Sequence, residues 1–116
     1  MKIVDESRID EKGYLTRWLI GPWNSQASFD FGIAFIQPKQ YIKKHFHEKI
    51  EELFYVIEGE IQLLLSNKEE FTLKQGFVAH IPPKQVHGLH NRSNKIVKLV
   101  VVKSPSIPSD KKYVEK

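Results

Sequence analysis

The chain has 116 residues, of which 41% are hydrophobic and 28% are charged, so one soluble globular domain is expected and a disordered chain is excluded. It contains no cysteine, which excludes disulfides, thiolate metal sites and cysteine nucleophiles and favours a cytoplasmic location. The net charge is +4, but lysines alternate with glutamates and no apolar run is long enough to cross a membrane, so neither a nucleic acid nor a membrane is expected as a partner.

Short apolar segments separated by turn residues predict an all-β protein without helices. The first strand is predicted over 14–20, and the second over 29–35, where alternating apolar side chains define one apolar face. Further strands are predicted over residues 41–47, 53–57, 61–65, 71–73, 77–81 and 96–102. We expect Glu58-Gly59-Glu60 to form a tight turn into the strand over 61–65 and the segment 96–102 to be buried on both faces.

Many short strands with regular turns predict a sandwich or a barrel. We expect one domain over residues 1–116, with an N-terminal arm over 1–13, a barrel over 14–103 and an extended C-terminal tail over 104–116, either loose or laid over a neighbour. The N-terminal segment, with Trp18 and Trp23, carries more aromatic surface than one small barrel readily buries. A homodimer is therefore predicted.

Histidine and glutamate form a candidate metal site. His45 and His47 alternate on a predicted strand, so both imidazoles lie on one face, with Cα atoms about 6.5 Å apart. They can then converge on one ion at metal–nitrogen distances of about 2.1 Å. Glu51 and Glu52 directly precede an apolar strand, where a carboxylate is costly unless it has a partner or a ligand. His87 follows from a distant part of the chain, as a ligand from another strand would.

Other interpretations of these residues remain open. A lone His-x-His pair on a strand is more often a surface or hydrogen-bonded pair than a metal site. For His80, inside a predicted strand, and His90, on the loop after His87, a structural role or a supporting hydrogen bond is favoured.

Two spacing patterns carry a resemblance to a known family. His45 and His47 are followed by four residues, Glu52, six residues and Gly59, and this resembles the first motif of the cupin superfamily. The second cupin motif is similar to the run of Gly76, five residues, Pro82, then His87, three residues and Asn91.

The resemblance implies a single cupin domain folded as a double-stranded β-helix, the jelly-roll barrel. It also implies that His45, His47, Glu52 and His87 bind one metal ion, with Glu51 as the weaker alternative to Glu52. Two glycines that are usual in these motifs are absent, one near Lys39 and one at Lys84. These departures concern the conformation of loops and leave the ligands in place.

Three imidazoles and one carboxylate suit a divalent transition metal, whether Mn, Fe, Ni, Co, Zn or Cu, and leave one or two coordination positions open. Tyr41 and Lys43 share the parity of the histidines, and Phe54 shares that of Glu52, so these three are predicted to line a pocket for a small-molecule ligand. Their chemistry favours a small organic acid, a sugar or a phenolic compound.

Three functions remain open at this point. The first is a metal-dependent enzyme, either an oxygenase such as a dioxygenase or an isomerase or lyase. The second is a non-enzymatic ligand-binding or sensor protein, and the third is a barrel whose metal is only structural. No catalytic residue is predicted, because the fold hosts many functions.

Overall fold

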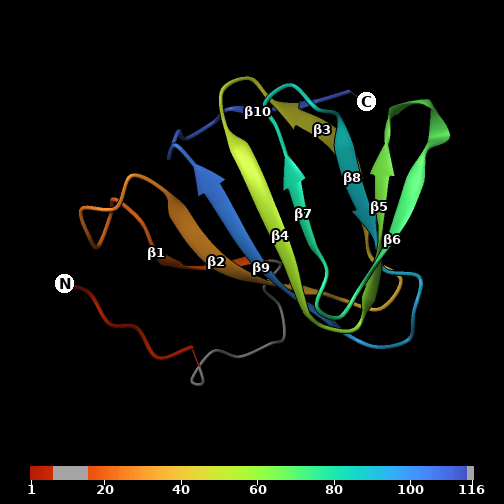
Figure 1. Ribbon diagram of the computed structural model, residues 1–116, viewed down its shortest axis with the longest axis horizontal. Helices are drawn as coiled ribbons and strands as arrows, with labels where there is room; N and C mark the ends of the chain where they lie inside the picture. Colours follow the sequence, from red (N-terminus) through yellow and green to blue (C-terminus); the bar gives the residue numbers. More distant parts are fainter. Residues whose placement is uncertain (7–15, 115–116) are drawn as a thin grey trace.

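The computed structural model describes residues 1–6 and 16–114, and these form two five-stranded antiparallel sheets. One sheet has the strand order β1-β2-β9-β4-β7 and the other β10-β3-β8-β5-β6 (Figure 1). The strands are β1 (Thr16–Ile20), β2 (Asp30–Ile36), β3 (Tyr41–His47), β4 (Glu51–Glu58), β5 (Glu60–Leu65), β6 (Glu70–Lys74), β7 (Val78–Ile81), β8 (His87–His90), β9 (Val97–Ser104) and β10 (Lys111–Tyr113). This is the predicted all-β architecture, with a 3-10 turn at Ser66–Lys68 between β5 and β6.

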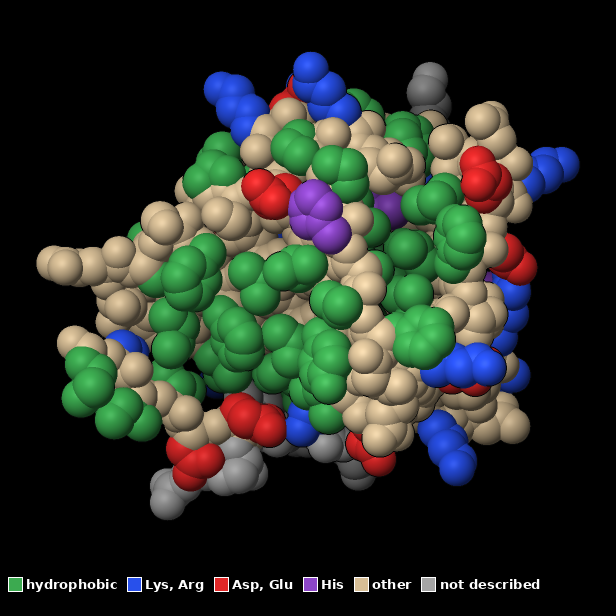
Figure 2. Space-filling view, in the orientation of Figure 1, with side chains coloured by type: hydrophobic (Ala, Val, Ile, Leu, Met, Phe, Trp, Pro, Cys, Tyr) green, Lys and Arg blue, Asp and Glu red, His purple; other side chains and the backbone are tan. Residues whose placement is uncertain are grey.

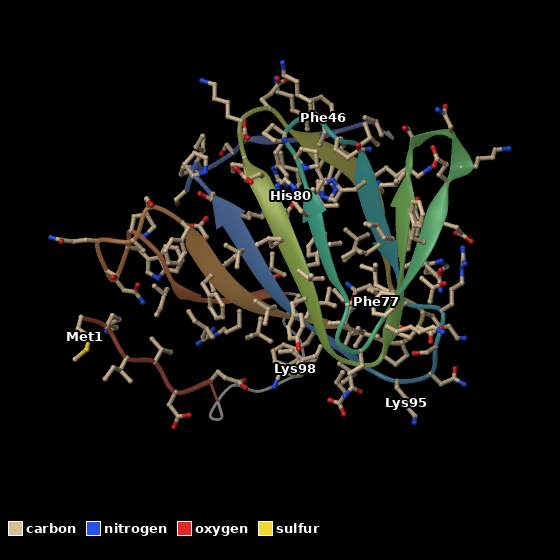
Figure 3. All side chains as sticks on the ribbon, in the orientation of Figure 1. Met1, Phe46, Phe77, His80, Lys95 and Lys98 are labelled. Atoms are coloured by element: carbon tan, nitrogen blue, oxygen red, sulfur yellow. The ribbon has the colours of Figure 1, made fainter. Side chains whose placement is uncertain are left out.

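The core lies between the two sheets and follows from alternation along the strands. On β4, the inner face carries Glu52, Phe54 and Val56, all of them buried. On β9, Val97, Leu99 and Val101 are buried in the same way and belong to the same core as Phe54 and Val56. Figure 3 shows side chains filling the space between the sheets. Because a strand presents alternate residues to opposite faces, this spacing fixes which residues can reach the interior.

The turn at Glu58-Gly59-Glu60 is as tight as expected, since only Gly59 separates β4 from β5, and it connects the two sheets. Gly59 has a φ of +93°, and a Cβ there would lie 3.0 Å from the Val97 side chain, so the crossing needs glycine. The expectation that the segment 96–102 is buried on both faces was wrong. The residues of β9 that alternate with its buried ones are only half-buried.

The strand β8 was not predicted, because half of its four residues are histidine and one is glycine. As a result, His90 ends a strand and does not lie on a loop after His87. β8 lies between β3 and β5 in its sheet, so it places His87 beside the strand that carries His45 and His47.

The outer face of the β1-β2-β9-β4-β7 sheet is apolar. Ile33 and Phe35, from the predicted apolar face of β2, point away from the barrel core and cluster with Leu19. Large hydrophobic side chains stay exposed on the same sheet, among them Leu53, Tyr55 and Val78. Figure 2 shows apolar side chains gathered over β9, β4 and β7.

The C-terminal segment 104–114 returns to the barrel. β10 pairs antiparallel with β3, which places Lys111 opposite His47 and Tyr113 opposite His45. The Asp110 carboxylate accepts hydrogen bonds from the backbone N–H groups of Lys49 and Ile50, at 3.0 and 3.1 Å. The segment therefore lies against the histidine-bearing strand. Residues 7–15, which include the predicted end of the arm and the predicted start of the first strand, lie outside the described residues.

Candidate metal centre

Four buried side chains converge at one end of the barrel. His45 and His47 come from β3, His87 from β8 and Glu52 from β4, so both sheets contribute. One ligand atom from each lies within 4.8 Å of all the others. The Nε2 atoms of His47 and His87 are 2.8 and 3.0 Å from Oε1 of Glu52. The structure thus brings together the four residues that the resemblance implied, as a compact donor set.

Strand register produces this convergence. His45 and His87 are direct partners across β3 and β8, and direct antiparallel partners share a face. Their rings lie 4.4 Å apart, centroid to centroid. Glu52 reaches the same space from the opposite sheet because it is on the inner face of β4.

Two of the three imidazoles are oriented by backbone carbonyls. Nδ1 of His45 donates to the carbonyl of Lys43 at 2.8 Å, and Nδ1 of His87 donates to that of Gln85 at 2.9 Å. A carbonyl only accepts, so Nδ1 carries the hydrogen and each neutral ring presents the Nε2 lone pair to the centre. Such hydrogen bonds orient metal-binding histidines in proteins.

The donor set fits a cation. With its Nδ1 hydrogen on the Gln85 carbonyl, an uncharged His87 ring would direct the Nε2 lone pair at a carboxylate oxygen 3.0 Å away, which is repulsive unless a proton or a metal ion lies between them. Donor atoms about 3 Å apart also match neighbouring ligands that share one ion at about 2.1 Å. Nδ1 of His47 is buried and has no hydrogen-bond partner among the described residues.

Burial and hydrogen bonding hold the donors in metal-binding forms. Desolvation lowers the pKa of His45 to about 4, and the nearby His87 and Lys111 act in the same direction. Burial by itself would raise the pKa of Glu52, but the adjacent imidazoles of His47 and His87, whose Nε2 atoms lie against its carboxylate, outweigh it and hold that pKa well below its usual range. At neutral pH, His45 is therefore uncharged and Glu52 is ionised.

Glu51 and His80 lie away from this centre. Glu51 points to the exposed side of β4, where its carboxylate pairs with Nε2 of His80 at 2.8 Å. Figure 3 labels His80 on β7, the neighbour of β4. Of the two candidate carboxylates, only Glu52 faces the histidines. The ring of His90 packs edge-on against Tyr41, 5.5 Å between centroids.

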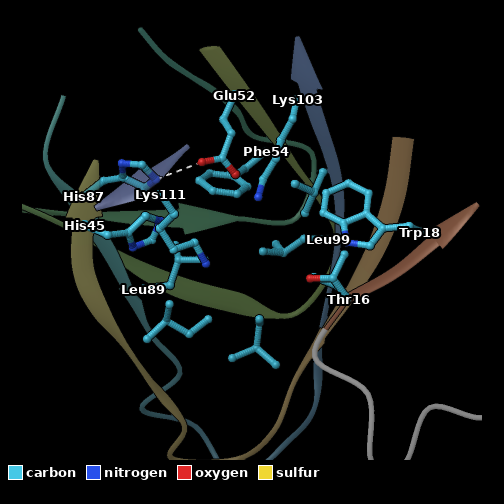
Figure 4. A pocket seen from close by; sticks show the side chains of 14 residues that line it. Thr16, Trp18, His45, Glu52, Phe54, His87, Leu89, Leu99, Lys103 and Lys111 are labelled. Carbon is cyan, nitrogen blue, oxygen red and sulfur yellow. Dashed lines mark hydrogen bonds and ion pairs between the residues drawn. The ribbon is translucent and has the colours of Figure 1, made fainter. Parts of the chain in front are cut away.

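The centre opens onto an internal cavity of about 60 Å³. Its walls are mainly apolar, and the polar side chains that face it besides His45, Glu52 and His87 are Thr16, Trp18, Lys103 and Lys111 (Figure 4). A second, outer hollow of about 240 Å³ also touches Trp18, Lys103 and Lys111 and includes His47. The candidate centre therefore adjoins two hollows that share Trp18, Lys103 and Lys111 in their walls.

Only one of the three residues predicted to line the pocket does so. Phe54 faces the cavity, whereas Tyr41 and Lys43 are on the other side of β3 and do not line it. The reason is an irregularity in the pairing of β3 with β8 between Ile42 and His45, which shifts the alternation. Ile42 takes the inward position instead.

Sequence reasoning missed Trp18, Lys103 and Lys111 as pocket residues. From its place in the sequence, Trp18 is expected among the aromatic residues that one barrel would leave exposed, whereas in the structure Trp18 packs against the core. A signal for Lys103 did exist, because it continues the inward parity of Val97, Leu99 and Val101. No pattern predicted Lys111, whose position depends on the pairing of β10 with β3.

Comparison with known proteins identifies the family. A cupin-domain profile matches residues 32–103. A polyketide synthase named CurC from Streptomyces cyaneus is 30% identical over 111 residues, covering 92% of this chain and 71% of its own. The chain belongs to the cupin family. An uncharacterized protein of Methanocaldococcus jannaschii is 36% identical over 61 residues, 53% of this cupin and 48% of that protein.

Solved structures show the same fold. The polyketide cyclase RemF from Streptomyces resistomycificus superposes on this cupin with a TM-score of 0.83 at 24% identity, over 100% of this chain and 87% of that one. An uncharacterized protein with a double-stranded β-helix domain from Klebsiella pneumoniae gives a TM-score of 0.79 at 22% identity, over 100% and 99%. No helix among the described residues has the length and hydrophobicity needed to cross a membrane.

Proposed function

We propose that this cupin is a metal-dependent enzyme that acts on a small carbonyl compound of phenolic or polyketide type, by isomerase or lyase chemistry such as ring closure. The observation that carries the proposal is that His45, Glu52 and His87 of the four-residue donor set lie on the wall of a small, mainly apolar chamber. A purely structural metal site would need no such chamber. A relative named as a polyketide synthase and a structural neighbour named as a polyketide cyclase favour this substrate class.

In this proposal His45, His47, Glu52 and His87 hold one divalent transition metal. A bound ion of this kind would supply Lewis-acid polarisation of a carbonyl oxygen. Apolar side chains line most of the chamber, among them Phe54 and Leu99. They would exclude water and position a flat substrate beside the donor set.

The reaction class is tested by product mass. The metal-loaded protein is incubated in air with an aromatic 1,3-diketone, benzoylacetone, and with linear polyketide-like triketones. A new, separable product of unchanged mass, or one that has lost water, supports isomerase or lyase chemistry, and a gain of two oxygen atoms would instead assign a dioxygenase. The Glu52→Gln variant is the control for background reaction.

The non-enzymatic alternatives give different results. Binding of these compounds without any product, at every metal loading, would favour a ligand-binding or sensor protein. A bound metal without an exchangeable water, seen by relaxation of water protons around bound Mn²⁺, would favour a structural site. Either result contradicts the enzyme proposal.

We also propose a homodimer formed through the apolar outer face of the β1-β2-β9-β4-β7 sheet, and one domain over residues 1–116 with the arm, barrel and tail predicted above. The exposed Leu53, Tyr55 and Val78 support the dimer, because their contact with a second copy would remove apolar surface from water. Light scattering at low micromolar concentration tests it, and the mass of one chain, 13.6 kDa, would contradict it. The predicted cytoplasmic location stays a prediction.

A further inference from the structure

We propose that Lys103 and Lys111 form an anion-binding subsite at the neck of the chamber, so that the substrate of this cupin carries a carboxylate or another oxyanion beside a small apolar body. The inference rests on the proposed function of the same pocket and narrows its substrate class. It concerns two residues from different sheets, β9 and β10.

Both lysines face the candidate centre because of strand register. Lys103 is the direct partner of Glu52 on β4, so the two side chains share the inner face of the sheet. Lys111 is the direct partner of His47 on β3 and shares its face. Figure 4 shows both lysine side chains entering the space between the histidines and Trp18.

Neither ammonium group forms an ion pair with a carboxylate in the part of the chain that the structure describes. Nζ of Lys103 instead lies 5.2 Å from the centre of the Trp18 ring, and Nζ of Lys111 lies 5.7 Å from that of Tyr113. Lys103 is half-buried, where an uncompensated charge is costly. An incoming anion would offset this cost and gain charge-assisted hydrogen bonds.

The balance of charge around the chamber favours an anion. Asp30 and Glu52 flank Lys103 on the neighbouring strands, so two carboxylates face two lysines. A divalent ion on the donor set would leave an excess of two positive charges, counted over these groups and the ion. A neutral substrate would leave that excess uncompensated in a small, mainly apolar chamber.

The shape of the two hollows sets the orientation of the ligand. Trp18, Lys103 and Lys111 line both the 60 Å³ chamber and the 240 Å³ outer hollow, so the lysines lie where the two meet. The chamber corresponds to about two water molecules at about 30 Å³ each, and its walls are mainly aliphatic side chains and Phe54. The charged group of a ligand would therefore stay at the neck while a small apolar body enters the barrel.

The test compares two probes of nearly equal shape, benzoate and benzamide, which differ in charge. Their dissociation constants are measured by calorimetry for the wild type, with and without bound Zn²⁺. We expect benzoate to bind at least about tenfold more tightly than benzamide, as expected for hydrogen bonds to a charged group. Equal affinities in the wild type would overturn the proposal without any variant being needed.

Variants then assign the preference to the lysines. Lys103→Met and Lys111→Met keep side-chain length and remove charge, and the double variant should reduce the preference to about threefold or less. Lys112→Met is the matched control, because Lys112 pairs with Phe46 on the opposite face and forms an exposed ion pair with Glu48. Circular dichroism checks that each variant is folded. A preference that survives in the folded double variant would contradict the proposal.

These measurements need no turnover, so they separate this inference from the proposed function. If benzoate is preferred but no compound is converted, the subsite stands and the enzyme proposal fails. If substrates are converted while neutral and anionic probes bind equally, the enzyme proposal stands and the subsite fails.

Discussion

The carboxylates of Glu51 and Glu52, consecutive residues of β4, lie on opposite faces of one sheet. Glu52 is buried against His47 and His87, and Glu51 is exposed and pairs with His80. The pleat of a strand imposes this separation, since neighbouring side chains alternate between faces. The chain therefore contains its own matched pair for testing the metal site.

Glu52→Gln should weaken metal binding by at least about tenfold, because an ionised donor becomes a neutral amide. His47→Ala should likewise leave most of the purified protein without metal while the barrel still folds. Glu51→Gln should leave affinity unchanged. Elemental analysis and competition with a chromogenic chelator measure all three. Metal binding that Glu51→Gln impairs and Glu52→Gln spares would assign the wrong carboxylate to the centre.

The metal-free protein should lose stability in mild acid. His45 has a pKa of about 4 in the fold, below its ordinary 6.5, so the unfolded chain takes up the proton first. Above about pH 6.5 the ring is neutral in both states and the free energy of unfolding does not depend on it. As the pH falls from there toward 4, the free energy of unfolding decreases by about 3 kcal/mol. Glu52 adds a further loss at lower pH. Its pKa is lowered in the fold, so the ionised carboxylate stabilises the protein and this stabilisation is lost when the carboxylate is protonated.

Chemical denaturation across pH 4 to 7.5 measures this loss. His45→Gln should flatten the dependence, and His80→Gln, at an exposed site, should not. Added metal should restore stability in the wild type, since it competes with protons for the same nitrogens. An acid-induced loss of equal size in wild type and His45→Gln would exclude His45 as its source.

Lys84→Gly should stabilise the protein by about 0.5 kcal/mol. Lys84 has a φ of +70°, in the left-handed region that costs a residue with a side chain about 1–2 kcal/mol. Glycine removes this cost, but it also increases the conformational entropy of the unfolded chain, which lowers stability by about 0.5–1 kcal/mol. This is one of the two positions where the cupin motifs usually carry glycine, and the other, Lys39, has a φ of +65°. Both departures in sequence thus coincide with unusual backbone conformation.

Equilibrium unfolding in urea measures the effect of Lys84→Gly. Lys74→Gly, within the extended strand β6, is the control and should destabilise by about 0.5–1 kcal/mol. The hydrogen bond from the Lys84 N–H to the carbonyl of His47, 2.7 Å long, is retained by glycine. A loss of stability as large as that of the control would show that the left-handed conformation carries no cost here.

Asp110→Ala should release the C-terminal segment. The backbone N–H groups of Lys49 and Ile50 donate to this carboxylate, and the hydrogen bond from Lys49 contributes most to lowering the pKa of Asp110. Without it, amides of β10 should exchange hydrogen faster and trypsin should cut sooner after Lys111. Glu48→Gln, which removes only an exposed ion pair with Lys112, should change neither rate appreciably. Equal effects of both variants would refute a specific role for Asp110.

The sequence predicted most strands and all four members of the donor set. Period-two alternation is a local property, so strands such as β3 and β4 could be located without knowing their partners. The spacing of the two motifs pointed to His45, His47, Glu52 and His87 together, although each residue taken alone was ambiguous.

What sequence reasoning missed depends on pairing between distant segments. Tyr41 and Lys43 were placed in the pocket by parity, and the irregularity in β3 shifts that parity. Trp18 and Lys111 reach the chamber only because β1 and β10 occupy the outer positions of the two sheets. No local pattern carries this information.

The central position of β9 has a consequence for synthesis in the cell. β9 lies between β2 and β4 in its sheet, yet it is encoded after both of them. While the ribosome is still making residues 37–96, β2 can pair with β1 but not with β9, its other neighbour, and its apolar residues have no finished core to enter. The sheet can close only after β9 has left the exit tunnel, so the pairing that completes it comes late and folding should be slow. The nascent protein is thus a natural client for chaperones that shield apolar strands.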